Sequence, residues 1–330
     1  MRWELVHSHV KSREAYPWCV RAVLIANPSA TTSAGWSRDI IVRALEAELD
    51  LTVEFTERRN HAIEIAAEAR AKHADVVISL GGDGTVNEVI NGLLLSGTSG
   101  PIPLLATIPA GLANVFPRAL GFNPDAMTAT GEILQSLSAG HKRSISLGRV
   151  NERWFSFNAG FGFDAGIVAA MEDQRAEGHK ASSSRYIITL LRQYLEEHDW
   201  NSPKLTVTAA DGRTEDGVFM VIAQNTTPYV FVGPLPLDFS TGASFERGLD
   251  IIALTDMSPL SLATYLAEAA AGVPTEKRAN ITLFEDCSEV QISASEPIPV
   301  QVDGDSIGDF SEVTLTSWMN VLDVVIPSDS

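Results

Sequence analysis

The stretch SLGGDGTVNEVINGLL, residues 79–94, places three glycines and one aspartate between a strand-like run and a run with helical periodicity. Glycine lets a backbone approach a ligand closely because no Cβ intervenes, and a helix N-terminus attracts anions. In an open α/β sheet, this junction of strand and helix is where ligands bind. Gly81, Gly82 and Gly84 are therefore predicted to form a loop that a phosphate can approach.

Asp83 lies inside this loop, where its negative charge would repel a phosphate unless a cation intervenes. Mg²⁺ is the usual intermediary for nucleotide phosphates. The alternative is an ordinary turn whose aspartate stabilises its own loop. The spacing G-G-D-G is not the dinucleotide fingerprint G-x-G-x-x-G, and no Gly-Lys-Ser/Thr follows, so the P-loop is also excluded.

The sequence on either side of the loop predicts a strand before it and a helix after it. A continuous apolar run, Asp75–Leu80, is typical of a strand buried on both faces. The following helix is predicted to begin at Thr85, because Thr85 and Glu88 form a capping-box pattern and apolar residues follow at helical spacing. Similar alternation from about residue 20 predicts βαβ units around a parallel sheet. The other predicted strands are Val20–Ala26, Leu51–Thr56 and Ile102–Ile108, and the other predicted helices are Trp36–Leu49 and His61–His73.

Beyond residue 145, apolar residues alternate with polar ones, and turn signals such as D303-G304 separate the runs. This pattern predicts an antiparallel sandwich or barrel, interrupted by helices near 179–198 and 259–271. A shift in composition near 138–142 predicts an α/β domain at 20–140 and a β domain at 141–330. The last strands could return to the first domain.

The whole chain has 330 residues, is 45% hydrophobic and carries a formal net charge of −18. This acidic balance argues against nucleic-acid binding and against nonspecific adhesion to an anionic membrane. Two cysteines, Cys19 and Cys287, are too few for a disulfide framework, so we expect a reduced, intracellular protein. The polar N-terminus shows no signal-peptide pattern, and no apolar stretch approaches the roughly 20 residues of a membrane span.

Several motifs, in order along most of the chain, resemble the diacylglycerol kinase catalytic-domain family, which includes sphingosine and ceramide kinases and bacterial lipid kinases. GGDGTVNEV (81–89) resembles the family signature, and IANPSA (25–30) resembles its first strand and phosphate loop. VEFTERRNHA (53–62) resembles its second nucleotide contact, and IPAGLANVFPRALG (108–121) lies where the family has a glycine-threonine-x-asparagine-aspartate loop. FNAGFGFDA (157–165) resembles the opening of its β domain, and QVDGDSIGD (301–309) its aspartate-glycine-acid motif.

The resemblance implies an N-terminal phosphofructokinase-like parallel-sheet domain followed by a C-terminal antiparallel β-sandwich domain, with ATP in the cleft. Asp83 would lie beside the phosphates and their Mg²⁺. Asp305 would accept the proton of the substrate hydroxyl. The positions that would hold ATP are Asn27, Pro28, Ser29, Thr56, Gly81, Gly82, Gly84, Thr85, Asn87, Glu88, Gly111 and Asn114.

A lipid site is expected next to the motif FNAGFGFDA. Phe161 and Phe163 alternate on one face of a predicted strand; they are first of all core residues and could also line a lipid cavity. Asp164 beside them could accept a hydrogen bond from a lipid hydroxyl at the mouth of such a pocket, and the matching aspartate of the family lies near its substrate.

Two places depart from the family pattern. Leu112 replaces the threonine and Val115 the aspartate of the 108–116 loop, so contacts there must come from the backbone or from Asn114. Where the family commonly has Asp-Asp-Gly, which binds a structural Mg²⁺, this chain has Glu246, Arg247 and a glycine. Glu246 could still bind a hard cation, but the neighbouring arginine adds an opposing positive charge.

The predicted function is an ATP- and Mg²⁺-dependent lipid kinase, and first of all a diacylglycerol kinase that forms phosphatidic acid. An NAD kinase-like enzyme shares the glycine-aspartate loop, and a noncatalytic lipid-binding protein would account for Leu112 and Val115. We expect a cytoplasmic protein that is peripheral at the membrane surface, where its lipid lies. We expect no nucleic-acid partner and no transmembrane segment, and the sequence leaves a homodimer open.

Overall fold

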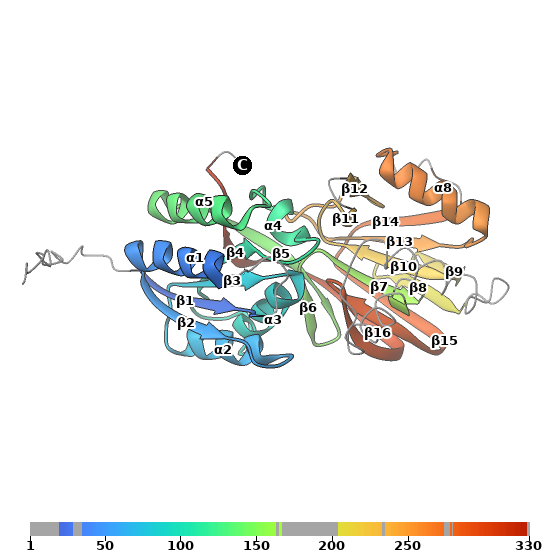
Figure 1. Cartoon of the computed structure of the whole chain (residues 1–330). Coiled ribbons are helices and arrows are strands. Elements are labelled where there is room, and N and C mark those ends of the chain that lie inside the picture. The colour runs from blue at the N-terminus through green and yellow to red at the C-terminus, as the bar shows by residue number, and fades with distance from the viewer. Residues whose placement is uncertain are drawn as a thin grey trace, which may run out of the picture.

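A computed structural model describes residues 20–28, 35–162, 165–166, 204–232, 235–273, 278 and 280–328. In the N-terminal half, strands alternate with helices, as the spacing of the apolar runs predicts (Figure 1). In chain order these elements are β1 (Arg21–Ala26), α1 (Gly35–Glu48), β2 (Asp50–Phe55), α2 (His61–Ala71), β3 (Val76–Gly81), α3 (Asp83–Leu93), β4 (Leu104–Pro109), α4 (Val115–Ala119) and α5 (Ala126–Ala139).

The four N-terminal strands form a parallel sheet in the order β4-β3-β1-β2. Every residue of β3 is buried, which explains why its sequence is a continuous apolar run and not an alternating one. Helices α1 and α5 contact each other on one face of the sheet, and α2 and α3 contact each other on the opposite face (Figure 1). Both faces are thus covered, as a parallel sheet requires.

The C-terminal half is antiparallel. Its strands run in the order β14-β13-β10-β7-β15-β16. Its elements are β5 (Lys142–Val150), β6 (Arg153–Phe155), β7 (Asn158–Gly162), β8 (Leu205–Ala209), β9 (Thr214–Val218), β10 (Met220–Gln224), β11 (Val230–Val232), β12 (Leu235–Leu237), β13 (Leu249–Leu254), α8 (Pro259–Ala270), β14 (Ile281–Cys287), β15 (Glu289–Val302) and β16 (Asp305–Val325).

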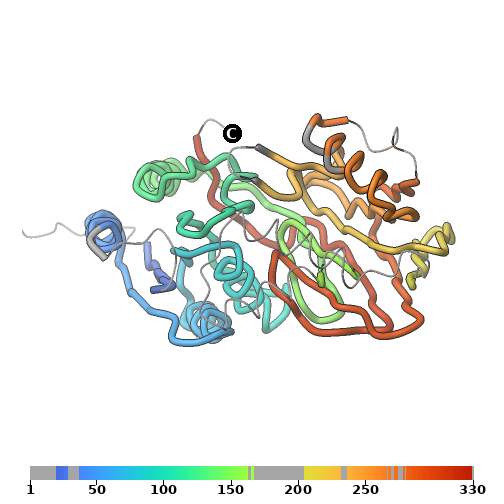
Figure 2. The backbone as a smooth tube through the Cα atoms, turned by 45° about the vertical axis from the view of Figure 1, so that its right-hand side comes forward, coloured from blue at the N-terminus to red at the C-terminus, as the bar shows by residue number. Residues whose placement is uncertain are grey.

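The long strand β16 joins the two halves into one sheet (Figure 2). Its first part pairs with β15, its second part pairs with β5, and Val324 lies opposite Leu105 of β4 in parallel register. The predicted fold class, a parallel N-terminal sheet followed by antiparallel strands, is confirmed. The boundary between residues 140 and 141 stays a prediction.

Alternation along the central antiparallel strands separates two apolar clusters. On β10, Val221 and Ala223 face one cluster, whereas Met220 and Ile222 face a second cluster that includes Tyr265 of α8. The strand is therefore buried on both faces because α8 covers one of them. The predicted helix at 259–271 is confirmed by α8, and the predicted helix at 179–198 lies outside the described residues. Within the described part of the chain, the helices are all too short or too polar to cross a membrane.

A matched pair of glycines tests the packing of α2 against α3. A Cβ on Gly92 of α3 would lie 2.3 Å from the carbonyl oxygen of Ile63 and 2.7 Å from the Cβ of Ala66. We expect Gly92→Ala to destabilise the protein by about 1–3 kcal/mol, because the two helices must separate. Gly131 of α5 has no neighbour within 4 Å, so Gly131→Ala should stabilise by about 0.5–1 kcal/mol. Urea unfolding measures the free energy of unfolding of both variants, and equal stability of the two would contradict this packing.

Candidate functional site

Each glycine of the β3–α3 loop lies against a different neighbour within the protein. A Cβ on Gly81 would lie 2.5 Å from Oγ1 of Thr85, and one on Gly84 would lie 3.0 Å from Oδ2 of Asp305. A Cβ on Gly111 of the β4–α4 loop would lie 2.5 Å from the Cα of Gly82. The two loops therefore touch backbone to backbone, and the glycines are required by packing as well as by any ligand.

The carboxylate of Asp83 caps the short helix α4. Its Oδ2 accepts a hydrogen bond from the N–H of Val115 at 3.1 Å, and its Oδ1 accepts one from the N–H of Phe116 at 3.1 Å. Burial raises the pKa of Asp83 to about 6, the two backbone donors oppose this rise, and the charges of Asp303 and Asp305 add to it. Asp83 thus fixes the β4–α4 loop and also lies close to two further acids.

Asn114 closes the same β4–α4 loop. Its Oδ1 accepts from the N–H of Gly111 at 2.8 Å, and its Nδ2 donates to the carbonyl of Gly111 at 3.0 Å. Asn114 is buried and has a left-handed backbone conformation with φ 48°. Its amide therefore shapes the loop around Gly111, and its predicted contact with ATP stays a prediction.

The carboxyl ends of the parallel strands bring several predicted positions to one edge of the sheet. The N–H of Asn27, after β1, donates to the carbonyl of Leu80 in β3, and the N–H of Thr56, after β2, donates to the carbonyl of Ala26. The side chain of Asn27 also lies 3.4 Å from Oγ1 of Thr85. Pro28 follows directly in the chain, and Ser29 lies outside the described residues.

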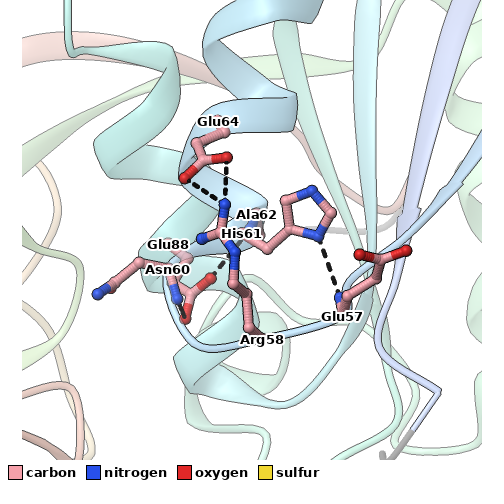
Figure 3. A network of polar contacts seen from close by, with 7 residues as sticks. All are labelled: Glu57, Arg58, Asn60, His61, Ala62, Glu64 and Glu88. Carbon is pink, nitrogen blue, oxygen red and sulfur yellow. Dashed lines mark hydrogen bonds and ion pairs between the residues drawn. The ribbon is translucent and has the colours of Figure 1, made fainter.

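The start of α3 differs from the prediction. The helix begins at Asp83 with Gly82 as its N-cap and has no side-chain capping bond, so the predicted capping box of Thr85 and Glu88 is wrong. The carboxylate of Glu88 instead accepts from the N–H groups of Asn60 at 2.8 Å and Ala62 at 3.1 Å (Figure 3). Glu88 therefore caps α2, a neighbouring helix, and this partner cannot be found from local spacing.

The side chain of Asn87 is fully buried in a polar network below the loop. Its Nδ2 donates to Asp303 at 2.8 Å and to the carbonyl of Trp154 at 2.9 Å, and its Oδ1 accepts from Nη2 of Arg153 at 2.6 Å. Asn91, one turn later, also donates to Trp154. Because these bonds use both ends of the amide, the side chain of Asn87 serves the fold, and its predicted contact with ATP stays a prediction.

Asp303 is the centre of this network and was not predicted from the sequence as a functional position. Its Oδ2 accepts from Nδ2 of Asn87 at 2.8 Å and from both the N–H and the Oγ of Ser156 at 2.7 and 2.9 Å. Its Oδ1 accepts from the N–H groups of Phe157 at 2.9 Å and Asn158 at 3.2 Å. Burial raises the pKa of Asp303, and these donors oppose the rise by favouring the charged carboxylate.

The same residue forms the turn between β15 and β16. Asp303 and Gly304 have φ of 50° and 81°, and Val302 pairs with Asp305, which is the geometry of a two-residue type I′ hairpin. The side chain of Gln301 accepts from the N–H of Gly304 at 2.9 Å. The turn predicted at D303-G304 is confirmed, and it delivers Asp305 to the glycine loop.

Arg153 brings a partly buried cation to this cluster of acids. Its Nε is buried without a hydrogen-bond partner among the described residues. Burial lowers its pKa, the charges of Asp305, Glu88 and Asp303 raise it, and the charge of Arg59 lowers it further. No local pattern predicts Arg153, because its hydrogen-bond partner Asn87 lies 66 positions away.

The predicted lipid positions are described only in part. Phe161 is fully buried in the apolar cluster of the antiparallel sheet, between Val221 on β10 and Val300 on β15. Its place agrees with the interpretation as a core residue. Phe163 and Asp164 lie outside the described residues.

The region of Glu246 does not fit a structural metal. Glu246 forms an ion pair with Arg143, and Nη1 of Arg247 donates to the carbonyl of Gly242 at 3.1 Å. Within the described ranges, no three His, Cys, Asp or Glu side chains are grouped so that they could hold a metal ion. Arginines therefore stabilise this loop, and we assign no metal to Glu246.

Comparison with known proteins supports the expected family resemblance and the fold. Residues 21–150 match the family model of the diacylglycerol kinase catalytic domain. The resemblance to this family is confirmed. A diacylglycerol kinase of Staphylococcus saprophyticus is 34% identical over 138 residues, which are 41% of this chain and 43% of that kinase. A diacylglycerol kinase of Staphylococcus aureus is 33% identical over 137 residues, which are 41% of each chain.

The chain thus spans less than half the length of these curated relatives of the diacylglycerol kinase family. A solved structure of a candidate diacylglycerol kinase from Bacillus anthracis strain Sterne superposes with a TM-score of 0.75 at 22% identity. The superposition covers 94% of this chain and 98% of that one, which shows a shared fold over both halves.

The network around Asp303 yields a stability prediction. In Asp303→Asn, an amide NH₂ replaces one of the two carboxylate oxygens. Oδ2 accepts three hydrogen bonds and Oδ1 accepts two, so in either orientation of the amide the NH₂ faces at least two donors. Each donor left unsatisfied costs roughly 1–3 kcal/mol, so we expect a large fall in the free energy of unfolding. Asp309→Asn, at an exposed position of β16, is the matched control and should change it little. Equal unfolding midpoints in urea would contradict the assigned network.

Proposed function

We propose that this chain is an ATP-dependent lipid kinase that phosphorylates the primary hydroxyl of diacylglycerol and forms phosphatidic acid at the membrane surface. The observation that carries the proposal is the contact between Asp305 and Gly84. Asp305 lies 222 positions beyond Asp83 (305 − 83), yet it lies against the loop that would bind the phosphates. A fixed acid beside a phosphate loop is what transfer to a hydroxyl requires.

The ATP phosphates would lie beside the point where the β3–α3 and β4–α4 loops touch, against the backbone of both loops. Gly82 and Gly111 present no Cβ there, so the phosphates can approach the backbone closely. The N-terminus of α3 adds a favourable potential for negative charge. Asn27 and Thr56, at the ends of β1 and β2, would contact the remainder of the nucleotide.

In the proposed reaction, the lipid hydroxyl oxygen forms a bond to the γ-phosphorus as the bond from that phosphorus to the β–γ bridging oxygen breaks, and ADP leaves. Asp305 accepts the hydroxyl proton. Asp83 would hold Mg²⁺, since Mg²⁺ takes one or two carboxylates together with substrate phosphates, and the ion would neutralise phosphate charge. A cation would fit beside Asp83, because burial raises the pKa of this carboxyl and the negative charges of Asp303 and Asp305 raise it further.

The two departures in the β4–α4 loop have different consequences. Asp83 uses the backbone N–H of Val115, which any residue except proline supplies, so the valine leaves this contact intact. Leu112 has an exposed side chain and offers no hydroxyl to a nucleotide. Binding of ATP at this point would therefore depend on the backbone of the loop around Gly111.

The substrate is tested by incubating the purified protein with Mg²⁺, γ-labelled ATP and acceptors in separate reactions. The acceptors are diacylglycerol, monoacylglycerol, ceramide and sphingosine in mixed micelles, and NAD in buffer. We expect the label in phosphatidic acid. Label in NAD alone would favour an NAD kinase, and lipid binding without transfer to any acceptor would favour a noncatalytic protein.

The role of Asp305 gives a kinetic prediction. Asp305→Asn keeps the size of the side chain but cannot accept the proton, so kcat should fall by roughly 10²–10⁴-fold with little change in the KM for ATP. Asp309→Asn on the same strand is exposed and should retain full activity. Because a purely structural turn residue would change the melting temperature and not kcat, a destabilised but fully active Asp305→Asn enzyme would refute the role as base.

A further inference from the structure

Arg59 contacts the segment that carries Asp305, and it comes from the opposite half of the chain. Arg59 lies in the β2–α2 loop, residues 56–60, and its Nη2 donates to the carbonyl of Ser306 at 3.0 Å. The two residues are 247 positions apart in sequence. This bond attaches the first residues of β16 to the N-terminal sheet.

The β2–α2 loop is itself firmly held, so it can serve as a reference point for β16. Figure 3 shows its contacts: the carboxylate of Glu88 accepts from the N–H groups of Asn60 and Ala62, and the N–H of Glu57 donates to Nδ1 of His61 at 3.0 Å. Because Glu88 belongs to α3, the loop is tied to the helix that begins at the glycine motif. The same loop starts at Thr56, which we propose to contact ATP.

Asp305 consequently lies between two anchored neighbours. On one side, the carboxylate of Asp303 is held by its five hydrogen bonds to α3 and residues 156–158. On the other side, the carbonyl of Ser306 is held by Arg59. With the main chain fixed at both ends, the carboxylate of Asp305 is kept against Gly84.

We infer that Arg59 is a positioning residue for Asp305, which fixes the proposed base relative to the phosphate loops by binding the carbonyl of Ser306. This inference rests on the proposed function. Arg59 also lies within electrostatic range of Arg153, whose charge in turn reaches Asp305, Glu88 and Asp303. Loss of Arg59 therefore removes both an anchor and a positive charge from the surroundings of the base.

The alternative is that Arg59 only holds the two halves together or binds ATP directly. These roles predict a lower melting temperature or a higher KM for ATP. A positioning role predicts a lower kcat at an unchanged KM, since misplacement of a reacting group by about 1 Å can cost up to about 10²-fold in rate.

The test compares four single variants and one double variant at a temperature where circular dichroism shows each to be folded. Arg59→Met removes the donor and the charge, and Arg59→Lys keeps both with a shorter reach. Arg58→Met is the matched control, because the neighbouring arginine pairs only with the exposed Glu64 among the described residues. Asp305→Asn supplies the reference for loss of the base, alone and combined with Arg59→Met.

We expect kcat to fall about 10- to 100-fold in Arg59→Met, to recover to within about threefold of the wild type in Arg59→Lys, and to stay unchanged in Arg58→Met. In the Asp305→Asn background, Arg59→Met should not lower kcat further, because the effects of two residues that act through the same group are not additive. Wild-type kcat in Arg59→Met, or a full additional loss in the double variant, would overturn the inference. If Asp305→Asn alone is fully active, the proposed function fails, and not merely the role of Arg59.

Discussion

A carboxylate buried away from water is stable only where donors surround it, and Asp303 meets this condition through α3 and residues 156–158. The position of the β15–β16 turn is thereby fixed, since Asp303 is also the first residue of that turn. The position of this turn determines where β16 begins and where Asp305 lies. One satisfied buried charge thus links the antiparallel sheet to the helix that follows the glycine motif.

The glycine motif packs directly against Asp305 and against the β4–α4 loop. A Cβ on Gly84 would lie 3.0 Å from the carboxylate of Asp305 and would displace it slightly, and a Cβ on Gly111 would lie 2.5 Å from the Cα of Gly82 in the adjoining loop. These requirements exist before any ligand binds. The aspartate of the motif has an internal role too, because Asp83 caps α4. A motif associated with phosphate binding is therefore also a packing motif that joins three chain segments.

Much of the fold could be predicted from the sequence, because its signals are local. The apolar run of β3, the periodicity of α8 and the D303-G304 turn each depend on residues within about ten positions. The site could be predicted only in outline. Glu88 has the spacing of a capping residue for its own helix, yet it caps α2, and the bond between Asn87 and Asp303 joins residues 216 positions apart. Arg59 and Arg153 carry no local signal at all, since their partners are brought to them by the sheet topology.

In the proposed complex, the nucleotide phosphates lie beside the contact between the two glycine loops, and the terminal phosphate faces Asp305. A crystal structure with Mg²⁺ and a nonhydrolysable ATP analogue measures this directly. We predict phosphate density against Gly82 and Gly111, with the γ-phosphate next to the carboxylate of Asp305. A nucleotide bound elsewhere, or one whose γ-phosphate faces away from Asp305, would contradict the account.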